Sequence, residues 1–223
     1  MQRVYGSYRE IGVLPADTAG YALEIRPGIA RVQTTAGTII LPGLVVNHMD
    51  RWVRVLLEVH LYDPAGRDLL AGHPLSDFGR HAAPFAALPP GGSNGFQHTM
   101  EGSWVEGLVV GYRLTVVKVA VAPIQPPLDV ADVRLERDDI GLTVTGTVTN
   151  RGAGECRSPL VTAIGYAADG RVYAVDPADV EDDGGEMVDT LPPGQSGRFE
   201  ATLLDDTNAV VRVEVVPGSG LFS

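Results

Sequence analysis

Apolar and polar residues alternate with a period of two along much of this chain, which is the pattern of β-strands with one buried face. The longest such run spans residues 51–63, with apolar side chains at Val53, Val55, Leu57, Val59 and Leu61. In the second half, apolar residues alternate with threonines over 142–149, and Asn150-Arg151-Gly152 ends that strand. Shorter strands are expected at 21–25, 29–35, 38–47, 96–100, 108–121, 160–166, 171–175, 198–203 and 210–216.

A corner motif occurs twice between these strands. Leu88-Pro89-Pro90-Gly91 is followed by Phe96, and Leu191-Pro192-Pro193-Gly194 is followed by Phe199. Pro-Pro-Gly continues neither a helix nor a central strand, so each copy predicts a tight corner with an aromatic residue entering a core beyond it. Asn47 and Asn150, and Gly66-Arg67 and Gly170-Arg171, keep the same offset of 103 or 104 residues. A constant offset over four landmarks indicates a duplicated domain.

The repeat and the strand pattern together predict the architecture. A unit of about 100 residues with seven or so short antiparallel strands has the size of an immunoglobulin-like sandwich. We therefore expect an all-β chain with two tandem Ig-like antiparallel β-sandwiches. The segment 121–128 contains three prolines and is the expected linker. The predicted organisation is an N-terminal extension at 1–20, a first domain at 21–124 and a second at 125–223.

Several of these motifs resemble those of the bacterial FxLYD family of Ig-like domains. The second half carries Gly146-Thr147-Val148-Thr149-Asn150, then Tyr166, a turn at Asp169-Gly170-Arg171, and the corner leading to Phe199. The first half matches the motif of the family name through Val59-His60-Leu61-Tyr62-Asp63, but lacks a clean Gly-x-Val-x-Asn strand. The resemblance covers about 60 residues of each half. It implies non-catalytic, extracytoplasmic modules and transfers no functional residues.

Charge is distributed unequally between the halves. Residues 1–120 carry ten acids and ten bases, whereas 121–223 carry eighteen acids and seven bases, so the net charge of −11 lies in the second half. No cluster of arginines forms, and a nucleic-acid surface would need one. The chain has no apolar run of about 18 residues, so no transmembrane segment is expected. Its first ten residues lack the apolar core of a signal peptide, although a leader removed earlier would leave no trace.

Enzymatic chemistry finds no support in the motifs. No serine stands in a Gly-x-Ser-x-Gly elbow, and nucleotide-binding glycine loops are absent. Cys156, the single cysteine, excludes disulfides and thiolate metal clusters; we interpret it as an incidental free thiol, although the adjacent Arg157 could lower its pKa. We therefore expect a chain that is not an enzyme and has no required cofactor.

Two metal sites are the candidate alternatives. His48, Met49, His98 and Met100 combine imidazole and thioether groups, which suit Cu(I) and are similar to the ligands of periplasmic copper carriers. Packing of 96–100 in the core is the simpler interpretation of the second pair. Seven acids lie between 176 and 189, among them Asp179, Glu181, Asp182 and Asp183, and could bind calcium if they converge. Without a cation we expect that loop to be mobile because like charges repel.

Apolar residues on both faces of two strands in the first half suggest a contact surface. The five candidate interface residues are Trp52, Leu56, Tyr62, Val109 and Val117. Either residues 1–20 or 71–95 cover this face, or a protein partner or another copy does. The sequence thus predicts a structural or interaction module at a cell surface or outside the cell, with an extracytoplasmic copper, calcium or small-ligand binder as the alternative.

Overall fold

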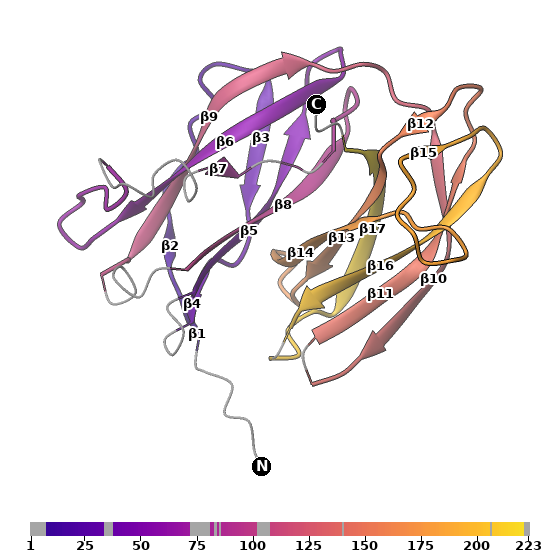
Figure 1. Cartoon of the computed structure of the whole chain (residues 1–223). Helices are drawn as coiled ribbons and strands as arrows, with labels where there is room; N and C mark the ends of the chain where they lie inside the picture. The colour runs from indigo at the N-terminus through magenta and orange to yellow at the C-terminus, as the bar shows by residue number, and fades with distance from the viewer. Residues whose placement is uncertain are drawn as a thin grey trace.

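The computed structural model describes residues 8–33, 38–71, 81–82, 84, 86–101, 108–139, 141–205 and 207–220. Over these residues the chain is all-β, without a helix, and most strand pairs are antiparallel. Figure 1 shows two groups of strands joined by one extended connection. We name residues 8–121 the first lobe and residues 128–220 the second lobe.

The first lobe contains two sheets. The five-stranded sheet consists of β1 (Tyr8–Glu10), β3 (Leu23–Pro27), β4 (Arg31–Gln33), β5 (Thr38–Asn47) and β8 (Ser93–Glu101). The four-stranded sheet consists of β2 (Gly12–Val13), β6 (Val53–Tyr62), β7 (His81–Ala82) and β9 (Gly111–Val121). Both sheets contribute to one core that includes Val32, Leu41, Val59, Phe96 and Tyr112. The alternation of β6 is confirmed, because its five predicted inward residues are all buried.

The second lobe repeats this plan with fewer strands. One sheet contains β10 (Leu128–Arg137), β11 (Gly141–Asn150) and β16 (Ser196–Leu204). The other contains β13 (Pro159–Tyr166), β14 (Val172–Asp179) and β17 (Arg212–Ser219). A short pair, β12 (Cys156–Arg157) and β15 (Thr190–Leu191), completes the lobe. Its core includes Val144, Val161, Leu191, Phe199 and Leu203 and is separate from the first.

The predicted corners have the same construction in both lobes. Gly91 and Gly194 take positive φ angles of 69° and 76°, which glycine adopts without strain. Phe96 and Phe199 are 0% and 2% exposed, as predicted.

Each of these rings lies over a glycine of the neighbouring strand. A Cβ atom on Gly43 would come within 2.5 Å of the Phe96 ring, and one on Gly146 within 2.7 Å of the Phe199 ring. The prediction that the first half lacks a clean Gly-x-Val-x-Asn strand was therefore wrong. Residues Gly43 to Asn47 form that strand. Apolar residues replace the threonines there, which hides the motif.

The N-terminal residues also need a correction. From Tyr8 onward they belong to the first lobe, since β1 pairs with β4 and β2 pairs in parallel with β9. Ile11 between these strands is 3% exposed and lies in the core. Strands of two and three residues are too short to show a period, so they could not be predicted from the sequence.

Strand β10 was missed for a different reason. Its pairing with β11 shifts between Ala131 and Arg134, at a β-bulge where Asp132 has a positive φ angle of 54°. A bulge reverses which residues face inward, so no single period covers the strand.

Candidate functional site

The five predicted interface residues do not form one patch. Val109 is completely buried in the core, whereas Leu108 and Val110 beside it are 51% and 43% exposed, the reverse of the predicted alternation. Val109 is therefore unavailable to a partner. Its carbonyl oxygen accepts a hydrogen bond of 2.7 Å from Arg9, which fixes this turn from the N-terminal side.

Leu56 and Val117 lie together on the outer face of the four-stranded sheet. Leu56 pairs with Lys118, and the register shifts at this point, so Val117 is bulged out and 43% exposed. Tyr62 lies at the far end of β6, where the Arg113 guanidinium stands 5.8 Å from its ring centre. Coverage of this face by residues 1–20 or 71–95 was one of the two alternatives, and of these segments residues 1–7 and 72–80 lie outside the described residues.

A charged group occupies the middle of the same face. His60 lies between two carboxylates, with Nδ1 2.9 Å from Asp68 and Nε2 3.6 Å from Glu58. About a fifth of each of these side chains is exposed. The two ring nitrogens contact different acids. The three side chains therefore form a chain of polar contacts and do not converge on one point.

The copper candidates are separated by the strand register. His98 in β8 pairs with Leu41, while His48 follows the opposite end of β5. Seven residues of extended strand separate Leu41 from His48, roughly 23 Å. His98 and Met100 are each 8% exposed, consistent with packing, and His48 is exposed, 3.2 Å from Glu24. The predicted copper set is therefore not brought together.

The acidic segment is ordered by its own backbone. Asp182 accepts hydrogen bonds from the N–H groups of Gly184 and Glu186, and Asp183 pairs with Arg198 at 3.1 Å. The backbones of Glu181 and Arg198 pair in an isolated antiparallel β-bridge. Across the described ranges, no group of three or more acids, histidines or cysteines could hold a metal ion. Calcium binding by Asp179, Glu181, Asp182 and Asp183 stays a prediction; in this structure Asp182 accepts from its own turn and Asp183 pairs with Arg198.

An arginine that the sequence analysis missed joins the two lobes. Arg31 of β4 is 3% exposed and stacks on the ring of Tyr173, 3.9 Å from its centre. Its guanidinium donates to the carbonyl oxygens of Tyr173 and, at 3.4 Å, of Leu204. In the sequence, the only sign that Arg31 joins the lobes was a single charged residue between the apolar residues Ala30 and Val32.

Backbone contacts and apolar packing extend the junction. The Ile29 N–H donates to Val172 at 2.7 Å, and Gly28 passes so close that a Cβ atom would meet the same carbonyl oxygen at 2.3 Å. Leu44 of the first lobe packs with a cluster of the second lobe: Ile164, Tyr166, Val172, Val175 and Val216. At the rim Arg171 and Glu10 form an ion pair of 2.5 Å. The lobes therefore form one continuous contact, with a buried charge and an apolar centre.

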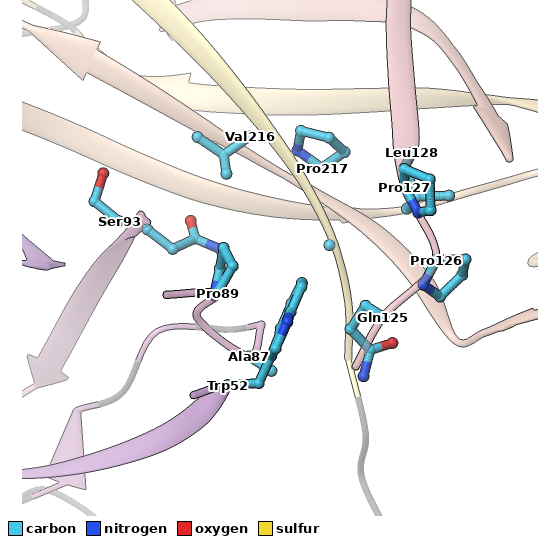
Figure 2. A pocket seen from close by; sticks show the side chains of 12 residues that line it. Trp52, Ala87, Pro89, Ser93, Gln125, Pro126, Pro127, Leu128, Val216 and Pro217 are labelled. Atoms are coloured by element: carbon cyan, nitrogen blue, oxygen red, sulfur yellow. The ribbon is translucent and has the colours of Figure 1, made fainter. Parts of the chain in front are cut away.

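A cavity of about 230 Å³ lies under the linker at this junction. Figure 2 shows the Trp52 indole pointing into it between Pro89 and Gln125. Prolines form much of the remaining wall: Pro126, Pro127 and Pro217. Trp52, predicted to anchor a partner, thus faces the space between the two lobes of its own chain.

Cys156 is buried and Asp176 is half-buried in the second lobe. Burial raises the pKa of the Cys156 thiol to about 11, so the neighbouring Arg157 does not activate it. Burial likewise raises the pKa of Asp176, and the hydrogen bond of 2.8 Å from the Thr202 N–H lowers it by less.

Comparison with known proteins adds no assignment: no protein-family model matches the chain, and no curated protein sequence matches it. Among the described residues, no helix has the length and apolar character needed to cross a membrane.

Proposed function

We propose that this chain is a non-enzymatic structural or protein-interaction module of an assembly at a cell surface or outside the cell. In this proposal its two lobes are tandem immunoglobulin-like sandwiches of the FxLYD type. The repeated corner, with Asn47 and Asn150, Gly91 and Gly194, supports the common origin of the lobes. The extracytoplasmic location rests on the resemblance of the motifs.

The observation that carries the proposal is the fixed junction. A buried arginine, a backbone hydrogen bond from Ile29 and an apolar cluster hold the lobes in one orientation. A contact of this kind gives the distal faces of the lobes a constant relative direction, which a module needs in order to space its partners. Leu56, Tyr62 and Val117 lie on the distal face of the first lobe and are the proposed partner contacts.

The native size of the protein tests this function. Extracts of cells that produce the full chain are fractionated by size under native conditions, comparing the wild type with the Leu56→Asp, Val117→Asp double variant. We expect the wild type in a complex larger than the free chain, and the variant released from it with its fold intact. Val211→Asp, at a residue 64% exposed on the second lobe, is the matched control. A wild-type chain that runs as a free monomer in the extract contradicts the proposal.

Binding of a small ligand is a second candidate, favoured by the junction cavity. A dry cavity of about 150 Å³ binds benzene in another protein, so about 230 Å³ suffices for a slightly larger ring. Phenol is the probe, and fluorescence of Trp52 in a Trp104→Phe background is the signal. Saturable quenching that Ala87→Leu abolishes by filling the cavity supports this function, and unchanged fluorescence excludes it for such ligands.

A further inference from the structure

The contact between the lobes joins two kinds of face. The first lobe contributes the outer face of β5 and β8, where Leu44 pairs with Gly95; we name this the acceptor face. The second lobe contributes the outer side of β13 and β14, with Ile164 and Tyr166; we name this the donor face. Because the lobes repeat each other, each has an equivalent of both faces, and one of each kind remains outside the junction.

The free acceptor face lies on the second lobe. The pair Thr147 and Arg198 in β11 and β16 corresponds to Leu44 and Gly95, so polar residues replace apolar ones. The β-bulge of β10 deepens this face into a hollow of about 550 Å³. Exposed charged residues line the hollow: Asp132, Arg134, Glu181, Arg198 and Glu200.

Three of these charges are carboxylates without a cation. Asp132, Glu181 and Glu200 form no ion pair with any described residue, whereas Arg198 is paired with Asp183. The hollow therefore holds three carboxylates and two guanidinium groups, and Arg198 is already paired with Asp183.

The free donor face lies on the first lobe and carries charges of both signs: the carboxylates of Glu58 and Asp68 flank His60, and the cations Arg113 and Lys118 lie beside this group. Tyr62 and Arg67 correspond to Tyr166 and Arg171 of the junction. Arg113 and Lys118 are exposed on this face, opposite His60 and Leu56, and neither has a carboxylate partner among the described residues. Arg67 is 80% exposed and is paired with Asp63 at 2.6 Å, and its counterpart Arg171 makes an ion pair across the junction.

The net charges of the two lobes also favour contact between the first lobe of one copy and the second lobe of another. The second half of the sequence carries the entire net charge of −11, while the first 120 residues are balanced. Two second lobes repel each other, so a second lobe meets the first lobe of another copy at lower electrostatic cost.

We propose that a second copy of this chain binds head to tail, seating the first-lobe donor face around Arg113 in the second-lobe hollow around Glu200. The inference rests on the proposed interaction function and names its partner. The two free faces are polar, whereas the two faces in the junction between the lobes are apolar. The contact between copies is therefore reversible and weakens with salt. Since the two faces differ, the contact is heterologous, and further copies can add at either end.

Sedimentation velocity of the purified full chain tests the proposal. At about 50 mM salt the average mass should rise with protein concentration, and at about 500 mM it should return to that of the monomer. Glu200→Arg and Arg113→Glu should each abolish association. An equimolar mixture of the two variants, or one chain with both substitutions, should regain it, because the reversed charges complement each other.

Glu155→Arg is the matched control, since it makes the same change of charge at an exposed residue outside the hollow. It should leave the mass distribution unchanged. Unaltered circular dichroism and melting temperature establish that each variant is folded. A chain that stays monomeric at low salt, association that survives Glu200→Arg, or a mixture that stays monomeric overturns the proposal. If the purified chain is monomeric while the native extract contains a larger complex, the interaction function stands and only this inference fails.

Discussion

Asn47 and Asn150 make the same buried hydrogen bonds in the two lobes. Each side-chain amide donates to the carbonyl oxygen four residues ahead and to the one 41 residues ahead, and each Oδ1 accepts from the N–H two residues ahead. Both side chains are completely buried. One asparagine thus ties the end of a strand to the following turn and to the distant Leu-Pro-Pro-Gly corner.

Replacing either asparagine should destabilise its lobe by a similar amount. Asn150→Ala leaves two carbonyl groups and one N–H without partners, which we expect to lower the free energy of unfolding by about 2–4 kcal/mol. Asn47→Ala should do the same in the first lobe. Urea denaturation measures both, with Thr149→Ala as the control because its hydroxyl bonds only to the exposed Ser196. A loss of less than about 1 kcal/mol in the free energy of unfolding at either asparagine would contradict this structural role of its hydrogen bonds.

Arg31 should determine whether the lobes unfold together. Arg31→Met keeps much of the apolar stem but removes the donors to Tyr173 and Leu204, so we expect a loss of about 2 kcal/mol at the junction. Calorimetry should then show two transitions where the wild type shows one. The control is Arg26→Met, at an exposed residue paired with Glu24. A single transition in the Arg31 variant would show that the apolar cluster suffices.

Asp176 should make stability fall as the pH rises. Its pKa in the folded chain lies above the ordinary value of 3.8, so the folded chain retains this proton where the unfolded chain has lost it. The free energy of unfolding therefore decreases between pH 3.8 and the raised pKa, and stays lower above it. Asp176→Asn still accepts the hydrogen bond from Thr202 and should flatten this dependence. Melting temperatures measured across that interval decide; identical profiles for both proteins would refute the effect.

Cys156 should react only when the chain unfolds. The thiol is fully buried and its pKa is raised to about 11, so little thiolate exists at pH 8 and reagents have no access to it. We expect no modification by a disulfide reagent in native buffer and complete modification in denaturant. Rapid labelling of the folded protein would mean that β12 and β15 open easily.

Local order could be predicted from the sequence because its causes are local. The alternation of β6 and β11 reflects one buried face of each strand, and Pro-Pro-Gly forces a corner wherever it occurs. The burial of Phe96 and Phe199 followed from the same reasoning. Strands with a bulge or with two or three residues, such as β10 and β2, gave no period and were missed.

Only the tertiary structure decided what each face of these strands meets. Arg31, Gly28 and Ile29 join the lobes through contacts with residues more than 140 positions away, and no local pattern records such a pairing. Trp52 and Val109 appeared equivalent as apolar residues, but one lines the junction cavity and the other lies in the core. The copper ligands were separated because strand register, which long-range pairing sets, places His48 and His98 at different ends of β5. Periodicity determines that a side chain leaves the strand on a given side, and the packing of distant segments determines whether that side is core, junction or solvent.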